Sequence, residues 1–194
     1  AAGALGSREA TRYDLSSEMP LTSEVTTGRL ENGLSYYIRE HKKPSDRAFL
    51  RLAVDAGSIL ESERQRGLAH YLEHMAFNGT ESYPKDELVG YLESLGMAFG
   101  PDISAYTGFD RTIYKLDLSV GQEGGLKKGF DILHQWAGRI SFRQEAIEDE
   151  RGVILEELRI GRDAQTRMRD QYYPVLFRNS RYAERLPIGT REQI

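Results

Sequence analysis

The chain of 194 residues contains no cysteine, so disulfides and thiol nucleophiles are excluded, and any metal site must use histidine or carboxylate ligands. It also lacks any apolar run near the roughly 20 residues that a membrane-spanning helix needs. Positive charge is not in excess, because the net charge is −4, and this argues against nucleic acid as the main partner. We therefore expect a globular protein with no transmembrane segment and no nucleic-acid partner.

Histidine is scarce, yet two of the four histidines stand close together. His70 and His74 are four positions apart within residues 67–80, and Glu73 lies between them. Positions i, i+3 and i+4 share one face of a helix, so both imidazoles can point at one metal ion with a carboxylate beside them. The order HxxEH is a known zinc-site layout, with the glutamate reversed relative to HExxH.

A helix can also carry two histidines for packing alone, and the motif by itself leaves both interpretations open. An apolar stripe beside the histidines predicts a helix that is at least half buried, and buried imidazoles need partners. This stripe consists of Ala69, Leu72 and Ala76. The absence of cysteine and a third candidate ligand further along also favour a metal site. The other two histidines, His41 and His134, are isolated, and we interpret them as structural.

The rest of the chain alternates strand patterns with helical ones, which predicts an α+β fold with a mixed, mainly antiparallel sheet packed against helices. Asn32-Gly33 joins two β-rich runs in a predicted hairpin. Strands are also predicted over residues 48–54, 97–107 and 112–118. Helices are predicted from Pro84 to a cap at Gly96, from Gly124 onward, and over residues 144–162 and 168–177, with a turn over 187–190.

Two of these helices have apolar stripes that we expect to face the core. The stripe of the helix after Pro84 is Leu88, Leu92 and Leu95, and that of the helix after Gly124 is Leu126, Phe130, Leu133 and Ala137.

The helix over residues 144–162 carries two glutamates that matter for the metal hypothesis. Glu150 and Glu157 are seven positions apart and therefore lie nearly on one line of the helix, and Val153 and Ile154 lie between them on that face. Carboxylates on an apolar face are costly unless they are paired or bound to metal. The same helix is crowded with other acidic residues, namely Glu145, Glu148, Asp149 and Glu156. From spacing alone, a solvent-facing role for Glu150 and Glu157 is favoured.

The combined pattern resembles the insulinase (pitrilysin, M16) family of zinc metallopeptidases, and most closely its PqqL-like periplasmic branch. The resemblance extends from about residue 24 to residue 194. The matching segments stand in the family's order: residues 31–34, 57–58, 67–80, 104–107, 150–157 and 187–189. It implies the fold of the LuxS/MPP-like metallohydrolases.

The resemblance implies roles for individual residues. His70, His74 and Glu157 would bind one Zn²⁺ per chain, although manganese or cobalt could occupy the same ligands. Glu73 would act as the general base, and Glu150 would support the site without binding the metal. The distance in sequence from His74 to Glu157 is longer than in the best-known members. This longer spacing implies a loop insertion. Glu156 is the alternative third ligand in the neighbouring register; Glu157 is preferred because its seven-residue step from Glu150 repeats the family pattern.

The substrate site is also implied by the resemblance. Ile103, Ser104, Ala105 and Tyr106 would match the edge strand on which a peptide lies as an added β-strand. Ser104 stands where the family usually has asparagine, so a side-chain contact with substrate is not carried over from the family to this position.

These implications predict a zinc metalloendopeptidase domain that acts on extended or unfolded peptides. Two alternatives remain open: a non-catalytic peptide-binding or structural subunit of the same fold, and a metal-binding module without hydrolytic activity. We expect residues 1–22 to be a flexible lead-in and residues 23–194 to be the N-terminal catalytic domain of a longer, periplasmic or secreted chain. Its later domains would be partners, and this part alone would bind zinc but hydrolyse peptide weakly or not at all.

Overall fold

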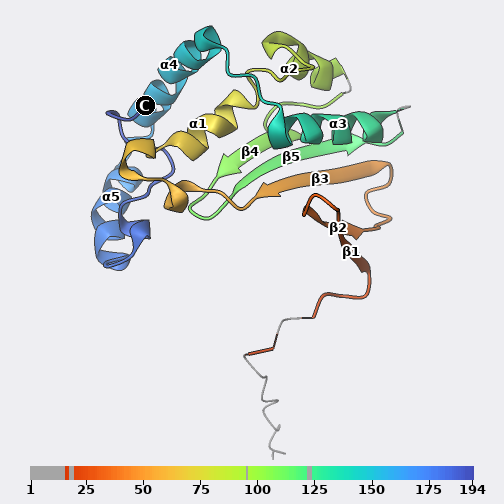
Figure 1. The fold of residues 1–194 in the computed structure, drawn as a ribbon, viewed down its shortest axis with the longest axis horizontal. Helices are drawn as coiled ribbons and strands as arrows, with labels where there is room; N and C mark the ends of the chain where they lie inside the picture. The colour runs from red at the N-terminus through yellow and green to blue at the C-terminus, as the bar shows by residue number, and fades with distance from the viewer. Residues whose placement is uncertain (1–15, 18–19, 95, 122–123) are drawn as a thin grey trace, which may run out of the picture. The chain divides into compact units, whose positions relative to one another are not determined.

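The computed structural model describes residues 16–17, 20–94, 96–121 and 124–194, and Figure 1 shows the course of the chain. Contacts between Cα atoms divide it into two compact units, Ala1–Ser45 and Asp46–Ile194, which are described separately. The lead-in predicted for residues 1–22 falls largely outside the described residues, as does Leu95 of the predicted apolar stripe.

The first unit contains the predicted hairpin. Strands β1 (Val25–Arg29) and β2 (Ser35–Arg39) pair antiparallel. The turn between them uses the special properties of Asn32-Gly33: Gly33 has a φ of 93°, and the Asn32 side chain accepts a hydrogen bond from the Leu34 amide at 3.1 Å. The Asn-Gly signal therefore predicted this hairpin correctly.

The second unit is built on a three-stranded antiparallel sheet in the order β3-β5-β4, from β3 (Arg47–Val54), β4 (Ile103–Thr107) and β5 (Thr112–Ser119). Burial alternates along β5, so one face of the sheet is covered and the other is more open. Strand β4 is shorter than the predicted 97–107, because Gly96 and Gly100 have positive φ and the Ile103 amide bonds back to the Ala98 carbonyl at 3.2 Å. A turn therefore replaces the first half of the predicted strand.

The helices of this unit are α1 (Leu68–Met75), α2 (Lys85–Ser94), α3 (Gly125–Gly138), α4 (Gln144–Ile160) and α5 (Ala164–Leu176). Helix α3 contacts β3 and β5, and α1 contacts β4, β5 and α4. Helix α1 consequently lies between α4 and the β4 edge of the sheet (Figure 1). None of the helices in the described part of the chain is long and apolar enough to cross a membrane.

The core combines side chains of the sheet with those of α2 and α3. Its fully or almost fully buried members include Leu88, Leu92, Ile103, Leu116, Ile132 and Trp136. Helix α2 ends as predicted at a left-handed glycine, since Gly96 has a φ of 77°. Its start differs by one position: the helix begins at Lys85, and the Pro84 carbonyl accepts bonds from the amides of Glu87 and Leu88.

The predicted apolar stripe of α3 is right for Leu133, which packs against the core, and wrong for Leu126, Phe130 and Ala137. Leu126 and Phe130 are 41% and 56% exposed, whereas Gly125, Gly129, Ile132 and Trp136 are buried. The reason is close packing at Gly129, where a Cβ atom would lie 2.4 Å from Leu118 Cδ2. The helix therefore turns its glycine side toward the sheet. Leu72 was likewise expected in the buried stripe of α1 but is 40% exposed.

Candidate metal centre

Helix α1 is anchored at its start by a buried carboxylate. Glu61 is 6% exposed, and its two oxygens accept hydrogen bonds from the amides of Gly67 at 2.9 Å and Ala69 at 2.8 Å. Amides at a helix N-terminus have no partner within the helix, so this carboxylate satisfies two of them. The helix that carries the HxxEH motif is thereby fixed at its first turn.

His70, His74 and Glu157 meet at the contact between α1 and α4. One ligand atom from each lies within 4.8 Å of the others. Glu157 Oε2 is 3.6 Å from His70 Nε2 and 3.4 Å from His74 Nε2. Tetrahedral zinc with bonds of about 2.0–2.1 Å places neighbouring ligand atoms about 3.4 Å apart. Two imidazoles and one carboxylate at these distances therefore suit a zinc ion with one further position open.

Glu156 lies away from this cluster. Its carboxylate is half exposed and bonds to Arg159 Nε at 2.7 Å. Glu157 is therefore the glutamate that the structure brings to the two imidazoles.

Glu150 holds His74 from the opposite side of its ring. Its Oε1 atom is 2.7 Å from His74 Nδ1, and its Oε2 atom accepts from Asn78 Nδ2 at 2.5 Å. Glu150 is 8% exposed, so the solvent-facing role favoured by spacing alone is wrong for this residue. The carboxylate keeps the proton of the ring on Nδ1 and leaves Nε2 free for a metal. The ring of His70 has no such support, because its Nδ1 is buried without a hydrogen-bond partner among the described residues.

The charges around His74 favour a cation. Burial lowers the pKa of His74, but its hydrogen bonds to Glu150 and Glu157 outweigh burial and raise this pKa to about 9. The same hydrogen bonds from His74 lower the pKa of both carboxyl groups. Burial lowers the pKa of His70. Two ionised carboxylates thus stabilise one positive charge at this place, whether a proton or a metal ion supplies it.

Glu73 is buried beside the two histidines, with 8% exposure. Its Oε2 atom accepts a hydrogen bond from Thr107 Oγ1 at 2.7 Å, and Thr107 belongs to β4. Burial raises the pKa of Glu73, and the Thr107 hydrogen bond opposes this rise. The sheet edge therefore fixes the orientation of this carboxyl group, which no pattern in the sequence indicated.

A cleft of about 380 Å³ opens over these groups. Residues Ala105, Tyr106 and Thr107 of β4 line one part of it, and Leu186, Pro187 and Ile188 line another. His70, Glu73, His74 and Glu157 line the cleft as well, together with Arg169. The metal-ligand candidates and the edge strand therefore share one cavity.

The segment 186–188 is held in place by a buried arginine. Arg185 is 5% exposed, its Nε donates to the Glu61 carbonyl at 3.1 Å, and its own carbonyl accepts from Ser58 Oγ at 2.6 Å. Gly189, in the predicted turn, lies so close to Gly67 that an added Cβ would be 2.6 Å from Gly67 Cα. The predicted turn is confirmed by its φ of 76° and its bond to the Leu186 carbonyl. Arg185 had no signal in the sequence, because arginines are usually exposed.

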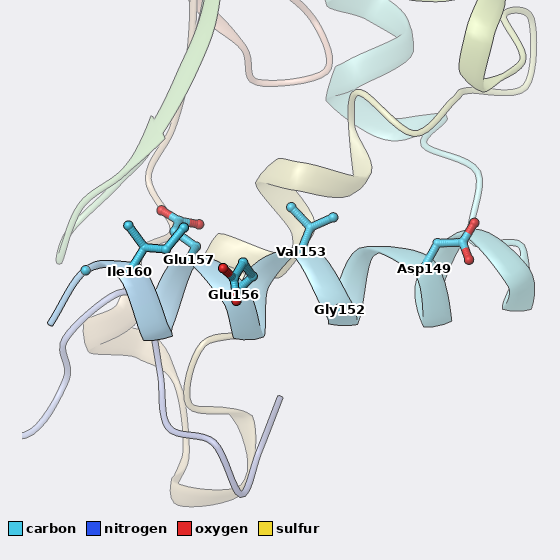
Figure 2. Close-up of a pocket in the computed structure, with 7 residues that line it drawn as sticks. Asp149, Gly152, Val153, Glu156, Glu157 and Ile160 are labelled. Atoms are coloured by element: carbon cyan, nitrogen blue, oxygen red, sulfur yellow. The ribbon is translucent and has the colours of Figure 1, made fainter.

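A second hollow, of about 690 Å³, lies along α4 and is lined by Asp149, Gly152, Val153, Glu156, Glu157, Ile160 and Gly161 (Figure 2). Val153 and Ile160 are 52% and 66% exposed. Glu157 is the lining residue that this hollow shares with the cleft. Apart from that glutamate, the hollow holds none of the metal-ligand candidates, which line the cleft instead.

Two histidines and a glutamate on one helix, joined by a carboxylate from a second helix beside a sheet edge, define the class of site found in zinc hydrolases of the HxxEH type. The family model for Insulinase (Peptidase family M16) matches residues 36–186, and the chain belongs to this family.

Relatives of this chain within the family include PqqL-like zinc proteases. The chain is 46% identical over 167 residues to the Zinc protease PQQL-like of Arabidopsis thaliana, covering 86% of this chain and 18% of that protein. The crystal structure of the periplasmic protease PqqL from Escherichia coli aligns with a TM-score of 0.88 and 37% identity, covering 91% of this chain and 20% of the other. The chain therefore spans about a fifth of the length of these relatives. The α+β fold predicted from the sequence is confirmed by this likeness.

Proposed function

We propose that this domain hydrolyses peptide bonds in extended or unfolded peptides, as a zinc metalloendopeptidase. The observation that carries the proposal is the meeting of His70, His74 and Glu157 in one cleft with buried Glu73 and an edge strand. His70, His74 and Glu157 would hold one zinc ion. Zinc in that place would polarise the scissile carbonyl and lower the pKa of the attacking water toward about 7.

Glu73 is the proposed general base. A buried carboxylate whose pKa is raised can take a proton from water and then pass it to the leaving amine. Thr107 donates to one of its oxygens, so the other is the atom that we assign to proton transfer. Thr107 therefore acts as the residue that orients the base.

The edge of β4 is the proposed substrate strand. Its main-chain geometry decides which of residues 103–106 can form hydrogen bonds with a peptide. The backbone of Ile103 is already bonded, since its amide donates to Ala98 and its carbonyl accepts from the Gly100 amide at 2.8 Å. Its side chain is fully buried. Backbone directions alternate along a strand, so the amide and carbonyl of Ala105 point to the same open side as those of Ile103.

We therefore assign main-chain pairing with a peptide to Ala105. Ser104 and Tyr106, the other residues expected here, lie opposite Lys115 and Ile113, and by the same alternation their amides and carbonyls point toward β5 and not toward the open side. Main-chain bonds do not depend on the side chains of the peptide, which fits an enzyme that accepts varied extended sequences.

The relatives are about five times as long as this chain, which supports a proposal about the rest of the protein. We propose that this domain is the N-terminal part of a longer chain, that later domains complete the substrate chamber, and that the protein works in the periplasm or outside the cell. The domain by itself would then bind zinc and turn over peptide slowly or not at all.

The change Glu73→Gln tests the proposed function. It removes the base but keeps the shape of the side chain and all three proposed ligands, so we expect zinc content to stay at one ion per chain. Turnover of an unfolded peptide by the full-length protein should fall by about 10²–10⁴-fold. Elemental analysis and a fluorogenic peptide assay measure the two quantities.

Glu156→Gln on the outside of α4 is the matched control, and it should change neither quantity. Unchanged turnover in Glu73→Gln would contradict the proposed mechanism. If the wild-type protein binds zinc yet cleaves no peptide, the alternative of a non-catalytic peptide-binding or structural subunit would take its place.

A further inference from the structure

Asn78 follows the end of α1 and is buried, with 5% exposure. Its Nδ2 atom donates to Glu150 Oε2 at 2.5 Å and to the His74 carbonyl at 3.2 Å. Its Oδ1 atom is buried and has no hydrogen-bond partner in the part of the chain that the structure describes. The side chain thus makes its bonds entirely through the amide nitrogen.

The chemistry of the Asn78 amide and the Glu150 carboxylate fixes which atom donates the hydrogen bond between them. An ionised carboxylate only accepts hydrogen bonds, so the NH₂ group of the amide must face Glu150. The other oxygen of Glu150 is 2.7 Å from His74 Nδ1. One donor on each oxygen defines both the position and the rotation of the carboxylate.

We propose that Asn78 is a positioning residue for the metal centre. It holds the Glu150 carboxylate in the one rotation that meets His74 Nδ1, and this turns His74 Nε2 toward His70 and Glu157. The inference rests on the proposed function, since it assigns a use to the site that would hold zinc. Asn78 itself touches neither metal nor substrate.

A purely structural role explains the geometry less well. The bond to the His74 carbonyl could stabilise the end of α1, but it is the longer of the two bonds. The buried and unpaired Oδ1 atom costs stability, because a polar atom loses its water without gaining a partner. Leucine has nearly the same shape as asparagine and would fill this position without that cost.

A double-mutant cycle tests the inference on this chain through its zinc affinity, measured by competition with a chromogenic chelator. Asn78→Leu and Glu150→Gln should each weaken zinc binding by about tenfold, the low end for residues that orient a ligand. The double variant should bind zinc no more weakly than Glu150→Gln alone, because Asn78 acts through Glu150. Additive losses would overturn the inference.

A second measurement does not depend on zinc. The ¹⁵N shifts of the His74 imidazole in the metal-free chain should change in Asn78→Leu, because the ring loses its fixed partner. A structural residue would instead lower the melting temperature and leave these shifts unchanged, and that result would overturn the inference. Should Asn78→Leu fold poorly, Asn78→Ala takes its place in both measurements.

Asn32→Ala is the matched control, since it removes a local side-chain bond in the hairpin of the first unit. It should alter neither the zinc affinity nor the His74 shifts. A wild-type chain that binds no zinc would contradict the proposed function, whereas zinc binding that Asn78→Leu leaves unchanged would contradict only the role of Asn78.

Discussion

Two glutamates of α4, seven positions apart, have the same chemistry and different surroundings. Glu150 is 8% exposed, and both of its oxygens already have N–H partners, His74 Nδ1 and Asn78 Nδ2. The Glu157 side chain is 50% exposed, and one of its oxygens faces the Nε2 atoms of both histidines. A carboxylate whose oxygens are occupied can orient a ligand, while one with an oxygen directed at two ring nitrogens can share a metal with them. Burial and partners therefore separate the two roles.

The largest expected effect is the loss of the exposed member of this pair. Glu157→Ala removes a direct metal ligand, so zinc affinity should fall by more than the roughly 10–100-fold that is typical for residues behind a ligand. Metal content after dialysis and a chelator competition measure it. Glu156→Ala is the control and should keep one zinc per chain; loss of zinc in Glu156→Ala alone would reverse the assignment of the two residues.

The helix that carries both glutamates depends on Ile154, which lies between them and is 1% exposed. Ile154→Ala should lower the free energy of unfolding by about 2–5 kcal/mol, because it leaves a cavity in a packed region. Its neighbour Val153 is 52% exposed, and Val153→Ala should change this free energy by less than about 0.5 kcal/mol. Urea unfolding of the metal-free variants tests the contrast. Equal losses of unfolding free energy in the two variants would show that Ile154 is not the side chain of α4 that packs against the rest of the protein.

A smaller effect is expected at the buried member of the pair. Glu150→Gln keeps the shape of the side chain but removes the charge that orients His74, so zinc affinity should fall by about tenfold while one zinc still binds at saturation. A loss as complete as that of Glu157→Ala would mean that Glu150 itself binds the metal. Isothermal titration with zinc gives both the affinity and the number of ions bound.

The smallest effect concerns pH. The pKa of His74 is raised from 6.5 to about 9 by its bonds to Glu150 and Glu157, so the protonated ring stabilises the metal-free fold. This contribution is complete below about pH 6.5 and is lost as the pH rises through 9. The melting temperature of the metal-free chain should therefore decline over that range, and less so in His74→Gln.

Zinc should remove this decline, because the metal replaces the proton on the ring. A metal-free melting temperature that is constant from pH 6 to pH 10 would show that His74 is not protonated between the two carboxylates.

The site was largely predictable because its central motif is local. The four-residue step from His70 to His74 matches one helical turn, so their shared face follows from the backbone geometry of α1. The hairpin at Asn32-Gly33 is local for the same reason. The role of Glu157 as a metal ligand came from the family resemblance and stays a prediction. The roles of the other site residues stay predictions as well, namely those of His70, Glu73, His74, Glu150 and residues 103–106.

The sequence by itself thus determined the helical motif, the hairpin, the α+β class and the family, since each depends on short-range periodicity or on an ordered set of motifs. Only the tertiary structure decided which side of α3 is buried and that Glu150 is covered. It also decided that Thr107 bonds to the Glu73 carboxylate and Asn78 to the Glu150 carboxylate. Glu150 and His74 are 76 residues apart in the chain. Burial at such a contact depends on how two distant helices pack, and no pattern within either helix contains that information.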